Sequence, residues 1–196
     1  DLSLLLDDID MVQTFKLQSF LKQLLISEFD PPINSSNFQN GGTILLRYRL
    51  KKLIEFGALE EAEALINLAN PTTLGLINIW GDISFLINRP DNFCKSVLKS
   101  SAVKIDPGIR VVCLARTGDW NAAAILLTSA VALGQINSES QKLLIRYLDP
   151  EAEIEINRNL GSVNLSPLHF FLKRTSGIRL SMDLLPLSFL YLDLGR

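Results

Sequence analysis

Two stretches of this chain, LIEFGALEEAEAL at 53–65 and LARTGDWNAAAIL at 114–126, follow one pattern. In each, an apolar segment ends at a glycine (Gly57 or Gly118), and a large apolar residue, an alanine and a leucine follow two, five and eight positions later. Glycine adopts the left-handed conformation that commonly ends a helix. The alanine, Ala62 or Ala123, leaves room for a second helix to pack closely against the first. Both stretches therefore predict helical hairpins.

A third reversal is expected midway, at Asn88, because asparagine also tolerates the left-handed conformation. The three turn residues are 31 and 30 positions apart, and Asp149 stands 31 positions after Gly118, again after an apolar helix end. A period near 30 is slightly shorter than the roughly 34 residues of tetratricopeptide repeats. We predict an all-α fold, a right-handed array of antiparallel helical hairpins (an α-solenoid of tetratricopeptide-like type). Chance similarity between ordinary helical hairpins is the alternative.

Apolar periodicity predicts helices along most of the chain. We expect a first helix between Ile9 and Phe29, followed by a loop rich in Asn, Ser and Gly from Ile33 to Gly42. The most apolar stretch, Ala122 to Leu133, is interpreted as a buried core helix. After the loop, helices are expected at about 43–56, 59–69, 72–88, 91–100, 107–117, 119–133 and 138–148.

Two regions differ in character. We assign residues 1–150 to the hairpin array and residues 151–196 to an irregular linker followed by C-terminal docking helices. Ser166-Pro167 predicts a helix start, because proline fits the first helical position, and another helix is expected after Pro186. The final apolar segment lacks the polar cap that solenoids need at their ends. We therefore expect a portion of a longer chain.

Composition excludes several classes of protein. Hydrophobic residues make up 47% of the 196 residues and charged residues 20%, which is unlike intrinsic disorder. A formal net charge of -2 gives no reason to expect nucleic acid as a partner. No apolar run reaches the roughly 18 residues of a transmembrane helix.

The only dense cluster of positive charge contains Arg47, Arg49, Lys51 and Lys52. At helical spacing these residues do not share one face, and Glu55 offers an ion-pair partner to Lys51. A solvated helix face is one interpretation and a functional anion site is the other. Arg47 and Arg49 are therefore candidates for partner binding.

The two tryptophans, Trp80 and Trp120, stand among apolar neighbours at helical positions. Core packing is the ordinary explanation. A tryptophan exposed on a binding surface is also a typical anchor for a partner, so both are candidate partner-binding residues. The single histidine, His169, has no catalytic partner near it in the sequence, and we expect no catalytic, cofactor-binding or metal-binding residues.

The two cysteines, Cys94 and Cys113, fall early in one predicted helix and late in the next. If these helices are antiparallel neighbours, the two sulfur atoms meet and can form a disulfide, which persists only in an oxidising compartment. Two buried, reduced thiols packed as small hydrophobic groups are the alternative. A spacing of 19 positions without further Cys or His ligands does not suit zinc.

The segment RVVCLARTGDWNAA at 110–123 is similar to part of a family of uncharacterised, exported bacterial proteins that are rich in helical hairpins. Weaker similarity extends to Gly57–Leu65 and Ser166–Leu168, so the resemblance covers about a third of the chain. It implies a helical-hairpin fold, a tetratricopeptide-like array longer than this chain, and export. It implies no activity.

These observations favour a non-catalytic scaffold or assembly factor of the bacterial cell envelope, periplasmic or secreted, that binds another protein. Solenoids expose a broad concave face for such binding, because each repeat contacts only its neighbours. One alternative is a helical superstructure domain of a peptidoglycan enzyme whose catalytic domain lies elsewhere. A secreted effector is another.

Overall fold

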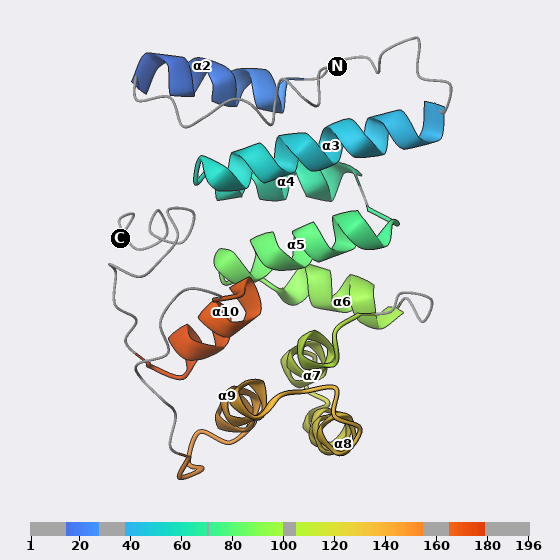
Figure 1. Ribbon diagram of the computed structural model, residues 1–196, viewed down its shortest axis with the longest axis vertical. Coiled ribbons are helices and arrows are strands. Elements are labelled where there is room, and N and C mark those ends of the chain that lie inside the picture. The colour runs from blue at the N-terminus through green and yellow to red at the C-terminus, as the bar shows by residue number, and fades with distance from the viewer. Residues whose placement is uncertain (1–14, 28–37, 70, 100–104, 155–164, 179–196) are drawn as a thin grey trace. The chain divides into compact units, whose positions relative to one another are not determined.

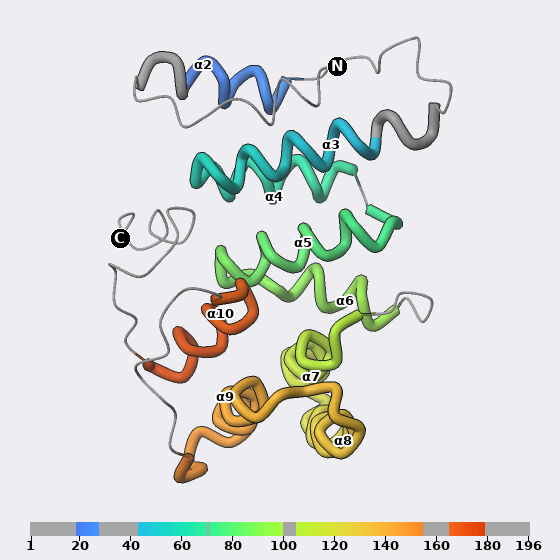
Figure 2. Tube along the Cα trace, in the orientation of Figure 1, coloured from blue at the N-terminus to red at the C-terminus, as the bar shows by residue number. Residues whose placement is uncertain are grey.

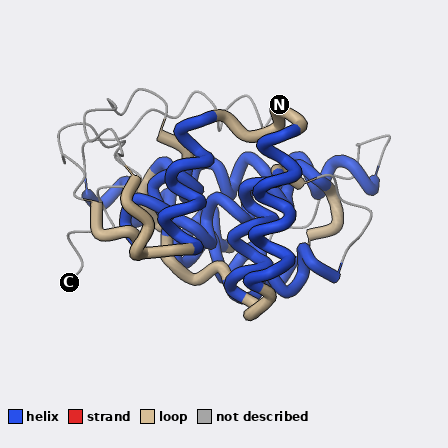
Figure 3. Tube along the Cα trace, turned by 90° about the horizontal axis from the view of Figure 1, so that it is seen from below, coloured by secondary structure: helices blue, strands red, loops and turns tan. Residues whose placement is uncertain are grey.

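The computed structural model describes residues 15–27, 38–69, 71–99, 105–154 and 165–178, without the side chains of 15–18 and 38–42. Every regular element in these ranges is an α-helix, which confirms the all-α prediction (Figures 1 and 3). The nine described helices are α2 (Phe15–Ile26), α3 (Phe38–Glu55), α4 (Leu59–Ala69), α5 (Leu74–Leu86), α6 (Asp91–Lys99), α7 (Pro107–Arg116), α8 (Trp120–Ala132), α9 (Ser138–Leu148) and α10 (Pro167–Thr175).

Most of these boundaries lie within a few residues of the expected ones, and α3 is the exception. It begins at Phe38, so the predicted loop at Ile33–Gly42 is wrong from residue 38 onward. Glycine costs about 1 kcal/mol in a helix relative to alanine, and a helix of 18 residues tolerates the pair Gly41-Gly42 near its start. The helix expected after Pro186 lies outside the described residues.

The three predicted reversals have the predicted conformation. The φ angles are 69° at Gly57, 59° at Asn88 and 91° at Gly118, all left-handed. At the first, the N–H of Gly57 donates to Ile54 O (2.9 Å) and the N–H of Ala58 donates to Leu53 O (2.8 Å). This pair of bonds defines a Schellman motif, and the same pair occurs after Asn88 and Gly118. Each reversal therefore satisfies backbone carbonyls that the helix end would otherwise leave without partners.

Gly134, with φ 68°, lies in the break expected between the helices at 119–133 and 138–148. Asp149 directly follows the end of α9 at Leu148, as expected, but its conformation is extended, with φ -131°, whereas the three turn residues are left-handed. Pro150 explains this difference, because a residue that precedes proline is pushed toward extended conformations.

The described residues fall into two compact units that divide between Ile83 and Ser84, within α5. In the first unit, α3 packs against both α2 and α4, with Leu50, Leu53 and Ile66 fully buried. The predicted close-packing alanine of this hairpin, Ala62, is also fully buried. Sequential packing of helices is thus present, while the right-handed solenoid stays a prediction.

The second unit is organised around α7, which packs against α6, α8 and α9. The last described helix, α10, packs against α9 (Figure 2). Phe171 of α10 is fully enclosed, and its ring centroid lies 5.3 Å from that of Phe85 and 5.9 Å from that of Tyr147. A segment remote in sequence therefore completes the core of this unit.

Helix α8 is not the buried core helix that its composition predicted. Ala123, Leu127 and Ala130 are buried, and Ala123 is the close-packing residue expected from the repeat. The opposite side of the helix is exposed, including Ile125 at 68% and Leu133 at 72%. Hydropathy summed over a segment does not reveal which face of a helix is covered, and here only one face is.

Candidate functional site

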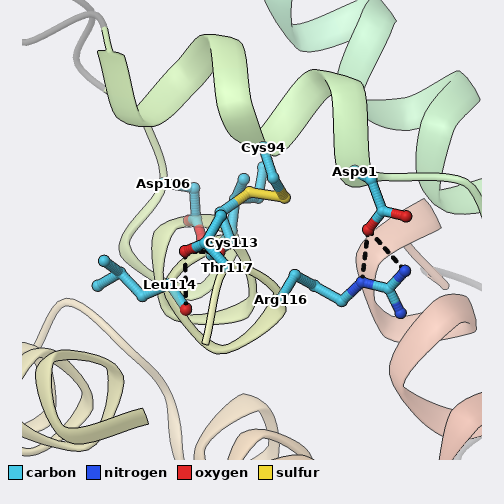
Figure 4. Close-up of a disulfide and its surroundings, with 8 residues drawn as sticks. Asp91, Cys94, Asp106, Cys113, Leu114, Arg116 and Thr117 are labelled. Carbon is cyan, nitrogen blue, oxygen red and sulfur yellow. Dashed lines mark hydrogen bonds and ion pairs between the residues drawn. A yellow bond between two sulfur atoms is a disulfide. The ribbon is translucent and has the colours of Figure 1, made fainter. Parts of the chain in front are cut away.

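The junction of α6 and α7 is closed by the predicted disulfide. Cys94, near the start of α6, is bonded to Cys113, near the end of α7, and both side chains are fully buried. Figure 4 shows α6 lying across the view while α7 runs nearly along it. The start of one helix thus meets the end of the next as expected, although the two axes cross steeply.

An ion pair joins the same two helix ends. Arg116 donates from Nη2 and Nε to Asp91 Oδ1, at 2.6 and 2.9 Å (Figure 4). Partial burial disfavours the charged guanidinium, but the hydrogen bond and charge of Asp91, aided by Tyr147, outweigh it and raise the pKa of Arg116. Because both partners are substantially exposed, this pair adds little stability of its own.

A serine and a histidine join α9 to α10. Ser140 Oγ lies 2.7 Å from His169 Nε2, and both residues are in the first turns of their helices. Burial lowers the pKa of His169, opposed by the charge of Glu139, so the ring is largely neutral at pH 7. Depending on which ring nitrogen carries the proton, Nε2 of a neutral ring accepts a hydrogen bond from the serine hydroxyl or donates one to it. The accepting form is also the arrangement that activates a nucleophile.

Acyl transfer also needs N–H donors aimed at the developing oxyanion. Here the N–H of Ser140 donates to Asn137 Oδ1 (2.8 Å), and the N–H of His169 donates to Ser166 Oγ (3.2 Å). Both nearby first-turn donors are therefore occupied by helix caps. We interpret the Ser140–His169 bond as a link between two helices. The sequence gives no signal for it, because the two residues are 29 positions apart and share no motif.

A buried lysine lies close to this link. Lys173 of α10 is 3% exposed, and its Nζ lies 3.9 Å from Glu139 Oε1. The partner carboxylate comes from the first turn of α9, where negative charge is favoured by the helix dipole. This ion pair adds a second polar tie between α9 and α10.

The exposed side of α8 forms a surface that we call the α8 face. It carries no charged residue, in contrast with the exposed positions of α6, which include Asp91, Lys95 and Lys99. Two hydroxyls on it are engaged within the helix, Thr128 Oγ1 with Ala124 O (2.9 Å) and Ser129 Oγ with Ile125 O (2.8 Å). The α8 face consists of Trp120, Asn121, Ala124, Ile125, Thr128, Ser129, Ala132 and Leu133.

The two tryptophans proposed as anchors occupy different environments. Trp80 of α5 is 8% exposed and belongs to the core, whereas Trp120 is 51% exposed at the start of the α8 face. The repeat aligns Trp120 with Leu59, which is 2% exposed. The same repeat position is thus covered in one hairpin and open in the other. Of the two tryptophans, Trp120 is the one accessible to a partner.

The two candidate arginines also differ. Arg47 is exposed, while Arg49 is half-buried and donates from Nε to Leu25 O (2.5 Å) and from Nη2 to Ser27 O (2.7 Å). Carbonyls at the end of a helix lack partners within that helix. Arg49 therefore caps the end of α2, a role that its sequence position did not reveal.

One carboxyl group has a strongly altered acidity. Burial raises the pKa of Asp82, on α5 in the first unit, from its usual value to about 6. At neutral pH its ionised form therefore carries a desolvation cost. The described residues contain no group of three His, Cys, Asp or Glu side chains placed to hold a metal ion.

No family model, curated protein or solved structure matches this chain. Within the described part of the chain, no helix has both the length and the apolar character needed to span a bilayer.

Proposed function

We propose that this chain is a non-catalytic, protein-binding scaffold of the bacterial cell envelope, a right-handed array of antiparallel helical hairpins that binds a partner through the α8 face. The observation that carries the proposal is the concentration of Trp120, Ile125 and Leu133 on one exposed, uncharged helix side. Large apolar side chains that gather on the exposed side of a folded protein commonly mark an interaction site.

The α8 face is supported by a well-packed helix. Its opposite side, where Ala123, Leu127 and Ala130 are buried, packs in a unit in which α8 contacts α7 and α9, and α7 is tied to α6 by the disulfide. A surface held in place before binding loses less conformational entropy when the partner arrives. The exposed side chains are therefore presented in a preorganised arrangement.

The disulfide supports the proposed location. Disulfides persist in the periplasm and outside the cell and are rare in the cytosol of most bacteria. The bond between Cys94 and Cys113 is consistent with such an oxidising compartment, so we place the scaffold in the periplasm or outside the cell.

In-cell photocrosslinking tests the binding surface. A photoreactive amino acid replaces Ala124 on the α8 face, and a matched variant carries it at the exposed Lys95 on α6. We expect an adduct with a second polypeptide from position 124 and none from position 95. Absence of an adduct from position 124, or equal adducts from both positions, contradicts the proposal.

A further inference from the structure

We infer that the disulfide between Cys94 and Cys113 is formed by thiol–disulfide exchange on the unfolded chain, before α6 docks on α7. The form that the oxidant recognises is thus the unfolded chain with two free thiols, and not the folded protein. This inference rests on the burial of the two cysteines and of the side chains beside them. It does not depend on the binding role of the α8 face.

The exchange takes two steps, and its oxidant is itself a disulfide. In the first step the thiolate of one cysteine attacks a sulfur of the oxidant, which gives a mixed disulfide and releases one oxidant thiol. In the second step the thiolate of the other cysteine attacks the sulfur of the first cysteine and releases the second oxidant thiol. The two thiols of this chain lose two electrons and two protons, and the disulfide of the oxidant gains both.

The first step needs an accessible sulfur atom, because a sulfur of the oxidant must come within bonding distance of it. Cys94 and Cys113 are both 0% exposed. Figure 4 shows their sulfur atoms between α6 and α7, where the two helices meet. An oxidant therefore reaches neither cysteine while α6 is docked on α7.

The side chains next to the two cysteines are buried as well. Val97 lies three positions after Cys94, hence on the same side of α6, and is 4% exposed, while Val112 of α7 is 0% exposed. Phe93 is 1% exposed, and its ring meets that of Phe85 edge to face with 5.8 Å between the centroids. Exposing apolar side chains to water is unfavourable in proportion to their area. Opening this side of α6 to an oxidant is therefore a rare event in the folded chain.

The unfolded chain suits the exchange better. The two cysteines are 19 positions apart, and a loop of this length closes readily because the entropic cost of closure grows slowly with length. The second step is therefore intramolecular and efficient. The 196 residues contain two cysteines, so oxidation within one molecule gives this bond alone and leaves no wrong pair to rearrange.

The order of oxidation and folding has a consequence for delivery, and this step rests on the proposed location. Thiols stay reduced in the cytosol of most bacteria. A chain that folded there would carry two buried thiols into the oxidising compartment, where the oxidant cannot reach them. In the periplasm or outside the cell, the chain therefore arrives unfolded and folds after the bond has formed.

The rate at which free thiol is lost to oxidised glutathione tests the inference. The 196-residue chain is reduced and refolded without oxidant, and circular dichroism checks that it is helical. We expect at least about tenfold slower loss of thiol in the folded, reduced chain than in the same chain in concentrated urea. The matched control carries Cys94→Ala, Cys113→Ala and Leu68→Cys, which places one thiol at an 83% exposed position of α4. Its rates in buffer and in urea should be similar.

A second pair of variants tests whether the docking of α6 protects the thiols. Phe93→Ala removes a buried ring of α6 and should speed the loss of thiol in buffer while leaving the rate in urea unchanged. Phe20→Ala removes a 59% exposed ring of α2 and should change neither rate.

A reduced chain that stays unfolded until it is oxidised also supports the inference, because oxidation then precedes folding. A folded, reduced chain that loses thiol as fast as in urea overturns it. A folded Phe93→Ala variant that reacts no faster than the unaltered chain overturns it as well. None of these rates depends on what crosslinks to position 124, so this inference and the proposed scaffold can fail separately.

Discussion

Two of the helix junctions in the second unit are closed by different chemistry. At the α6–α7 junction, a covalent bond between Cys94 and Cys113 lies beside an exposed ion pair. At the α9–α10 junction, Phe171 is enclosed by aromatic rings while Ser140 and His169 share a hydrogen bond. The stability of the α6–α7 junction should depend on reductant and hardly on pH. The stability of the α9–α10 junction should depend on pH and not on reductant. The groups that link two helices thus determine which solution condition changes the stability of the junction.

The largest effect is expected at the α9–α10 junction. Phe171→Ala removes a fully enclosed ring and should lower the free energy of unfolding by about 3–5 kcal/mol. Chemical denaturation measures the change. Phe20→Ala is the matched control, because Phe20 is 59% exposed and its removal should cost less than about 1 kcal/mol. Equal costs for the two variants would mean that α10 does not complete the core.

The second effect is expected at the α6–α7 junction. Replacing both Cys94 and Cys113 by alanine should lower the free energy of unfolding by about 3 kcal/mol, because the bond restricts the unfolded chain. The comparison is sharpened by adding reductant, which should destabilise the unaltered chain and leave the double variant unchanged. A double variant as stable as the oxidised chain would remove the distinction between the two junctions.

The third effect isolates the hydrogen bond between α9 and α10. Ser140→Ala deletes the hydroxyl that lies 2.7 Å from His169 Nε2 and should cost about 1 kcal/mol of unfolding free energy. Serine-directed phosphonate labelling provides a separate readout. Labelling of Ser140 in the native chain would contradict its assignment as a link between helices.

The effect of pH on the stability of the same junction should be smaller than the effect of Ser140→Ala. The pKa of His169 is lowered in the folded chain, so the unfolded chain binds more protons on acidification. The stabilisation is complete above the ordinary value of about 6.5 and decreases as the pH falls below it. Unfolding measured from pH 7 to pH 5 should therefore show a smaller loss in His169→Gln than in the unaltered chain. Parallel curves would exclude His169 as the titrating group.

The smallest effect belongs to the exposed ion pair. Arg116→Gln should change the free energy of unfolding by less than about 1 kcal/mol, and the difference should shrink at high salt. A larger, salt-independent loss would show that Arg116 contributes through Tyr147 and packing.

Features that depend on neighbouring residues were predictable from the sequence. The reversals at Gly57, Asn88 and Gly118 were located because a helix end is determined by a few adjacent residues. The disulfide was also predicted, on the condition that the two helices are antiparallel neighbours, and the early and late positions do meet although the helix axes cross steeply. Asp149 follows the end of α9, as its place in the repeat suggested, and its extended conformation also has a local cause, the proline that follows it.

Features that depend on tertiary packing were not predictable in this way. The apolar composition of α8 gave no indication that Ile125 and Leu133 face solvent, because exposure depends on which helices cover α8. The link between Ser140 and His169 and the capping of α2 by Arg49 join residues more than 20 positions apart. The type of each residue and its position in the sequence predicted neither contact.

Counting free thiols in the native chain tests the contrast between the junctions most directly. Cells are treated with a membrane-permeant alkylating agent before lysis, and the mass of the chain is measured with and without prior reduction. We predict no alkylation of the native chain and two added groups after reduction, at Cys94 and Cys113. Two alkylated cysteines without reduction would contradict both the covalent closure of α6 on α7 and the placement of this protein in an oxidising compartment.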